Sequence, residues 1–249
     1  MQFVVRRARL IGNFENAGGI IAPSSGVDLA RSFNGSSDRI DVGNSSTLNP
    51  ATISVSCWVY WTGTYFGGAG EQWFMARDDN SLGRAFALGL TGGVPALKLQ
   101  INGALGGNFG GDAGNVPANT WTRVTFTGNS ASGYICYVGS NAGSAQGSGT
   151  AMNTTTGDVT IGSRTYSGFQ GWVNGSIADP AIWNTILTPT QIANLAAGQR
   201  ANTIGANANL VNYLPILGQS PEPDKSGNSN NGVLTGTSIV AGPPTLQPF

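Results

Sequence analysis

The clearest hydrophobic pattern in the chain is a strict alternation over residues 53–61. Ile53, Val55, Cys57 and Val59 fall on one face, and polar or aromatic residues fall on the other. A period of two residues is typical of a β-strand with one buried face. Further strand-like runs are expected at residues 73–76, 84–90, 96–101, 116–126, 133–138 and 158–162. The pattern therefore predicts a protein built mainly from strands.

One helix is expected near residues 189–197. Thr188 is a good N-cap, a proline suits the first helical position, and Gln191 stands where a capping box needs its partner. Ile192 and Leu195 would face inward together. A run of strands followed by one short helix favours a β-sandwich whose open end the helix covers.

Composition narrows the classes of partner. Only 10% of the 249 residues are charged, and 12 basic against 12 acidic residues give no net charge. No basic patch indicates nucleic-acid binding, and no apolar run approaches the roughly 20 residues of a membrane span. A weakly charged surface is poorly protected against association, so we expect the chain to work in an assembly.

Histidine and cysteine usage limits the chemistry. The chain has no histidine, which excludes histidine-dependent catalysis and histidine-ligated zinc. Cys57 and Cys136 each lie in an apolar, strand-like run. They could form a disulfide only if their strands were neighbours, and the alternative is two buried free thiols.

The chain divides into three expected parts. Residues 1–31 are expected to form an extended or docking arm, and the alternative is a solvated leader. They show no secretory signal pattern. Residues 32–200 hold the predicted sandwich. Residues 201–249 form a C-terminal segment with an extended tail, expected to complete a strand pair in this domain or in a neighbouring subunit.

Several motifs carry a family resemblance. The segment Phe33 to Leu48, the strand around Trp121 and the run from Gly175 to Ile192 resemble laminin-G-like and pentraxin-like domains of the concanavalin-A-like lectin/glucanase superfamily. The motif residues are Trp121, Trp183, Thr188 and Gln191. The resemblance implies an all-β fold, a two-sheet antiparallel jelly-roll sandwich with one short helix. Pro180 departs from the motif and predicts an edge or a bulge.

The C-terminal segment resembles a strand pair that many laminin-G-like domains carry at their N-terminus. It comprises residues 210–216 and 221–236. This displaced order resembles jelly-roll proteins on the virions of tailed bacteriophages. The resemblance therefore implies a virion-surface location.

The carboxylates argue against catalysis. Glycoside hydrolases of the superfamily use paired carboxylates on one strand. Here the glutamates are Glu15, Glu71 and Glu222, and none stands in such a run. We therefore expect a protein that is not an enzyme.

Loops rich in carboxylate and amide oxygens predict a calcium site. Asp78, Asp79 and Asn80 are the best local set of ligands for Ca²⁺, with Asp158 as a donor from another loop. The alternative is that these residues only stabilise turns.

Trp58, Tyr60 and Asp112 are the candidate ligand-binding residues. The two aromatic side chains fall on the face of their strand opposite the core, where they would stack on a sugar or pack against another layer.

Two functions are compatible with these expectations. The first is a bacteriophage virion structural protein, a capsid decoration or tail-surface subunit, whose partners are other virion proteins or further copies of itself, with surface glycans as possible ligands. The second is a calcium-dependent carbohydrate-binding lectin module of a bacterial or cell-surface protein.

Overall fold

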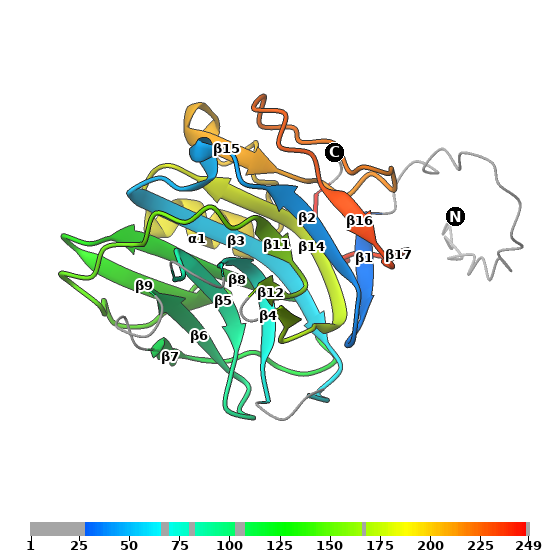
Figure 1. Cartoon of the computed structure of the whole chain (residues 1–249), viewed down its shortest axis with the longest axis horizontal. Coiled ribbons are helices and arrows are strands. Elements are labelled where there is room, and N and C mark those ends of the chain that lie inside the picture. Colours follow the sequence, from blue (N-terminus) through cyan, green and yellow to red (C-terminus); the bar gives the residue numbers. More distant parts are fainter. Residues whose placement is uncertain (1–27, 66–69, 80–82, 103–107, 166–167, 248–249) are drawn as a thin grey trace, which may run out of the picture.

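The computed structural model describes residues 28–65, 70–79, 83–102, 108–165 and 168–247. Two antiparallel sheets pack face to face in this part of the chain (Figure 1). The predicted all-β sandwich is therefore confirmed.

The first sheet, here sheet A, has the order β10-β9-β8-β3-β14-β1-β17, with β15 added beside β14. Its strands are β1 (Leu29–Asn34), β3 (Thr52–Trp61), β8 (Thr122–Asn129), β9 (Gly133–Val138), β10 (Asn141–Ala142), β14 (Asn174–Trp183), β15 (Leu210–Tyr213) and β17 (Ser238–Ala241).

The second sheet, sheet B, has the order β16-β2-β11-β4-β5-β6-β7. Its strands are β2 (Arg39–Gly43), β4 (Gln72–Arg77), β5 (Phe86–Leu90), β6 (Ala96–Ile101), β7 (Asn108–Asn115), β11 (Val159–Ile161) and β16 (Val233–Thr235). A small hairpin of β12 (Arg164–Thr165) and β13 (Phe169–Gln170) follows β11.

The core lies between the two sheets and is built by alternation. Ile53, Val55, Cys57 and Val59 of β3 all point into it, as their spacing predicts. Leu88 and its neighbours on sheet B meet them from the other side. Burial of these apolar faces supplies most of the driving force for the sandwich.

The helix α1 (Pro189–Ala196) begins as expected. The Thr188 hydroxyl accepts from the Gln191 backbone, and the Gln191 side chain accepts from the Thr188 backbone, so the predicted capping box is confirmed. Its position differs from the expectation. Ile192 and Leu195 pack with Trp183 in a cluster on the outer face of sheet A rather than at an open end of the sandwich.

The C-terminal segment pairs within the same chain. β15 lies beside β14, β16 beside β2, and β17 beside β1. The predicted irregularity at Pro180 is also present, because the β3–β14 register shifts between Ala178 and Ala181.

The bulge in β14 aims one carboxylate into the layer outside sheet A. Asp179 is fully buried, with a φ of 51°. It accepts from Arg123 of β8 at 2.8 Å, from Arg200 at 3.3 Å and from the Tyr213 hydroxyl of β15 at 2.7 Å. Arg200 in turn pairs with Asp28, just before β1. One carboxylate thus connects four segments that are distant in sequence.

Replacing Asp179 with asparagine tests this connection. Asparagine keeps the shape and tolerates positive φ, but it leaves two buried guanidinium groups without this counter-charge. We expect the free energy of unfolding to fall by about 3–5 kcal/mol in urea titrations. The control Asp158→Asn, at an exposed carboxylate, should change it by less than about 0.5 kcal/mol. Equal effects of the two variants would contradict this role.

The two cysteines do not meet. Cys57 lies on β3 and Cys136 on β9, with β8 between them. Two strand spacings exceed the separation that a disulfide spans. Both thiols are free and buried, as the alternative interpretation predicted.

Thiol labelling checks this placement. Burial raises the pKa of each thiol to about 12. Because the thiolate is the reactive form, we expect no alkylation of Cys57 or Cys136 in the native protein at pH 8. Both should react in denaturant, as counted by mass spectrometry. Rapid native labelling of either residue would show that its strand is misplaced.

Candidate functional site

The outer faces of the two sheets differ in what covers them. The outer face of sheet A is covered by α1 and its following loop, and by the C-terminal tail, whose Leu246 packs on Trp58. The outer face of sheet B carries the short β12–β13 hairpin and a hollow of about 380 Å³. Among the described surfaces, the hollow on sheet B is therefore the better candidate for a binding site.

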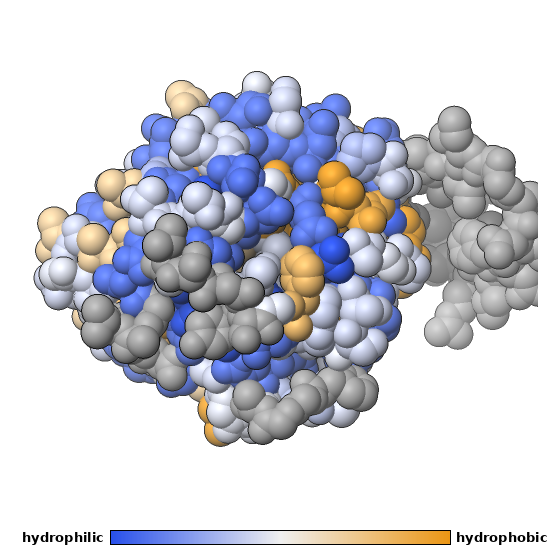
Figure 2. All heavy atoms as spheres, in the orientation of Figure 1, coloured by the Kyte–Doolittle hydropathy of each residue, from blue (hydrophilic) through white to orange (hydrophobic). Residues whose placement is uncertain are grey.

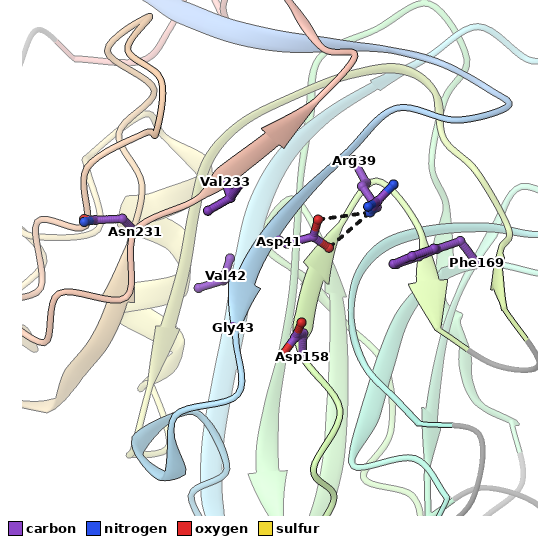
Figure 3. Close-up of a pocket in the computed structure, with 8 residues that line it drawn as sticks. All are labelled: Arg39, Asp41, Val42, Gly43, Asp158, Phe169, Asn231 and Val233. Carbon is purple, nitrogen blue, oxygen red and sulfur yellow. Dashed lines mark hydrogen bonds and ion pairs between the residues drawn. The ribbon is translucent and has the colours of Figure 1, made fainter.

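The hollow lies where β2, β16 and β13 come together (Figure 3). Alternation along β2 turns Arg39 and Asp41 outward while Ile40 and Val42 face the core. Val233 stands opposite Asp41 on the neighbouring strand. The remaining lining residues are Val42, Gly43, Asp158, Phe169 and Asn231.

Arg39 organises the hollow. Its Nε donates to both oxygens of Asp41, at 3.0 and 3.2 Å. Its guanidinium carbon lies 3.9 Å from the centre of the Phe169 ring, which is a cation–π contact. In the described part of the chain its two terminal nitrogens have no hydrogen-bond acceptor, so they can donate to a ligand.

The second carboxylate of the hollow is Asp158. It is exposed and forms no hydrogen bond or ion pair with the described residues. Burial raises the pKa of Asp41, and the negative charge of Asp158 raises it further, while Arg39 opposes the change. The hollow therefore offers one paired and one unpaired carboxylate beside an arginine.

A neighbouring cluster on the same face is internally paired. Arg164 of β12 binds Glu71 at 2.8 Å and lies 4.9 Å from the ring centre of Trp73. Trp73 Nε1 also donates to Glu71, and Arg84 pairs with Asp78 at 2.8 Å. These contacts hold the β12–β13 hairpin over the sheet and leave its Phe169 at the hollow.

Two of the predicted calcium ligands, Asp78 and Asp79, have partners within the protein. Asp78 is buried against Arg84, and burial raises its pKa although Arg84 opposes this. Asp79 accepts from the Thr155 hydroxyl and from the Thr156 backbone. Asn80 lies outside the described residues. Asp158 lines the hollow, and because Val159 stands opposite Arg77, its backbone runs beside that of Asp78. The described residues contain no group of three or more His, Cys, Asp or Glu side chains that could hold a metal ion, and the calcium site stays a prediction.

The predicted ligand-binding residues lie at separate places. Trp58 is buried beneath Leu246, and Tyr60 stacks with Trp121 at 5.7 Å between ring centres, both on the outer side of sheet A. Asp112 lies on β7, at the far edge of sheet B, and accepts from the backbone and hydroxyl of Ser144. Trp58 therefore packs against another layer, whereas Tyr60 packs against a cross-strand neighbour in sheet A.

Of the residues that line the hollow, only Asp158 was among the predicted site residues, as a calcium ligand. Alternation at residues 39–42 does indicate that Arg39 and Asp41 share an exposed face. Phe169 gives no such signal, because it lies in a strand of two residues. Asn231 and Val233 come from the C-terminal segment, whose place beside β2 depends on the tertiary fold.

Comparisons place this fold in a family. Residues 34–193 match the family model described as the concanavalin A-like lectin/glucanases superfamily. The chain belongs to this superfamily. A search of curated proteins finds no match. Within the described residues, no helix has the length and apolar character that crossing a bilayer requires.

Solved structures show the same fold at low identity. A candidate carbohydrate-binding protein from Bacteroides ovatus ATCC 8483 aligns with a TM-score of 0.65 and 16% identity, covering 86% of this chain and 60% of that one. The heptameric SAP-like pentraxin from Limulus polyphemus aligns with a TM-score of 0.60 and 15% identity, and the alignment covers 88% of this chain and 97% of that one. The CBM40 domain of the Ruminococcus gnavus IT-sialidase, bound to α2,3-sialyllactose, aligns with a TM-score of 0.50 and 12% identity. The alignment covers 69% of this chain and 100% of that one.

The pH dependence of stability tests the contact at Asp112. Hydrogen bonds from Ser144 lower the pKa of Asp112 below its ordinary 3.8. A lowered folded-state pKa stabilises the protein above pH 3.8, and this contribution is lost as the pH falls through the folded-state value. We expect Asp112→Asn to be less stable than the wild type at pH 7, with a gap that narrows below pH 3.8 in thermal unfolding. A gap independent of pH would contradict the contact.

Proposed function

We propose that this chain is a non-catalytic carbohydrate-binding domain, and that the hollow between β2, β16 and β13 binds a neutral sugar unit. The observation that carries the proposal is the combination of unused Arg39 nitrogens, the unpaired Asp158 carboxylate and an exposed Phe169 ring in one hollow. Sugar hydroxyls both donate and accept hydrogen bonds, and the C–H faces of a sugar ring pack on apolar surfaces. The hollow provides for each of these contacts.

Its charges favour a neutral ligand. Arg39 is balanced by Asp41, with which it pairs. Asp158 interacts electrostatically with the buried Arg77, but its carboxylate is exposed and places a negative charge at the hollow. This charge repels acidic sugars such as sialic or uronic acids. The CBM40 structure holds a sialylated ligand, so a likeness in fold does not carry over its choice of sugar.

The same contacts argue against hydrolysis. A glycosidase of this superfamily needs a pair of carboxyl groups, one to protonate the leaving oxygen and one to act as nucleophile or base. Both oxygens of Asp41 accept from Arg39, so Asp158 is left without a second free carboxyl group among the residues that line the hollow. The candidate carbohydrate-binding protein from Bacteroides ovatus supports a binding role for the fold.

The location of this domain and its partner proteins stay predictions. The order of the C-terminal motif favours a place on a bacteriophage virion surface, with other virion proteins or further copies as partners. Such a subunit would use sugar binding for adhesion, so the two functions are compatible.

Substitution of Phe169 tests the site. We expect Phe169→Ala to weaken binding to the best neutral oligosaccharide from a glycan array by about tenfold in calorimetry, because the ring face is lost. Ile186→Ala is the matched control, since both side chains are 40% exposed and Ile186 is not among the residues lining the hollow. Ile186→Ala should leave the affinity for the oligosaccharide unchanged, whether calcium or a chelator is present in the buffer.

Asp158→Asn tests the choice of sugar. Removing the charge should weaken binding of neutral sugars only a few fold, through one lost acceptor, and should improve binding of sialylated or uronic glycans. Stronger binding of acidic than of neutral glycans by the wild type would refute the proposed ligand class. Equal effects of Phe169→Ala and Ile186→Ala would refute the proposed site.

A further inference from the structure

Both sheets end at the same side of the sandwich. Among the described strands, β17 pairs only with β1, and β16 pairs only with β2. Gly236 and Thr237 alone separate the two strands in sequence, and Figure 1 shows them side by side. One side of the molecule therefore presents two strand edges.

The ladder between β1 and β17 shows which backbone groups face outward. Gly242 N–H donates to the Asp28 carbonyl at 2.7 Å, which makes that pair a hydrogen-bonded one. Such pairs alternate with non-hydrogen-bonded pairs along an antiparallel ladder. Leu29 opposite Ala241 and Arg31 opposite Ile239 are then non-hydrogen-bonded pairs. The N–H and C=O groups of Ile239 and Ala241 consequently point away from β1, toward the open edge.

This edge lacks the usual protection against pairing. Edge strands commonly carry charges, prolines or bulges that discourage the addition of another strand. No charged residue lies between Val233 and the C-terminus, and β17 contains no proline. Ile239 is 39% and Val233 58% exposed. Figure 2 shows hydrophobic residues gathered over the region of β16 and β17 on a face that is otherwise mainly hydrophilic or neutral.

We propose that β17 pairs antiparallel with β17 of a second copy of this chain, about a two-fold axis at Val240. Ile239 then stands opposite Ala241 of the partner subunit, and the reverse pair forms symmetrically. Each pair exchanges two backbone hydrogen bonds, and sheet A continues through both copies.

Symmetry is the reason to choose a second copy as the occupant. The outward groups lie at equal distances on either side of Val240, so the edge is its own complement. The absence of charge removes the repulsion that two identical edges would otherwise suffer. Pro243 and Pro244 follow one residue after β17 and limit the pairing to this short strand. The dimer is therefore weak and forms at high protein concentration.

Sedimentation equilibrium of the full chain and two variants tests the proposal. Ala241→Pro removes an N–H that faces the open edge and spares every bond to β1. We expect it to raise the dimer dissociation constant about 10- to 100-fold, because two symmetric hydrogen bonds are lost. Ile239→Lys should act similarly by placing two like charges at the edge.

Val94→Lys is the matched control. Val94 is 45% exposed and lies before β6, in a different sheet from β17. It adds the same charge and should leave the dimer intact. Thermal unfolding of each variant shows whether it folds, and Ile239→Lys decides the question if proline destabilises β17. A wild-type chain that stays monomeric, or a dimer that Ile239→Lys does not weaken more than Val94→Lys, overturns the proposal.

Discussion

The contact on which the arrangement depends is the buried carboxylate of Asp179. It lies on the outer side of sheet A and binds Arg123, Arg200 and Tyr213. Through Arg200 it also reaches Asp28 and the backbone carbonyl of Gln247. Buried charges are tolerated only when they are paired and hydrogen-bonded, so each of these segments must be in place for the others to remain. The β14 bulge thus fixes both ends of the described chain.

This closure decides where function can reside. With α1 and the C-terminal tail packed on sheet A, the outward-facing Trp58 of β3 becomes part of a smaller buried cluster with Leu246. Among the described residues, the outer face of sheet B carries the short β12–β13 hairpin, which Arg164 holds through Glu71 and Trp73. Its outer face keeps polar side chains and a hollow in contact with solvent. The asymmetry of the two faces follows from the path of the C-terminal segment.

The fold was predictable because its signals are local. The alternation of β3 and the capping box at Thr188 depend on residues that are close in sequence, and both are present in the structure. The candidate site was not predictable to the same extent. Arg39 and Asp41 follow from alternation, but Phe169 and Val233 reach the hollow through pairings across the chain. The sequence also does not reveal that Arg84 pairs with the carboxylate of Asp78, because that contact depends on the path of the loop between them.

The C-terminal segment joins the two surfaces to which function has been assigned. Asn231 and Val233 line the hollow, and a few residues later β17 forms the open edge of sheet A. Two copies joined at that edge would hold their hollows at a fixed separation. A single shallow hollow offers few contacts and binds weakly, whereas two hollows that engage one glycan surface gain from effective concentration. Pairing through β17 would therefore increase the avidity of adhesion without any change in the site.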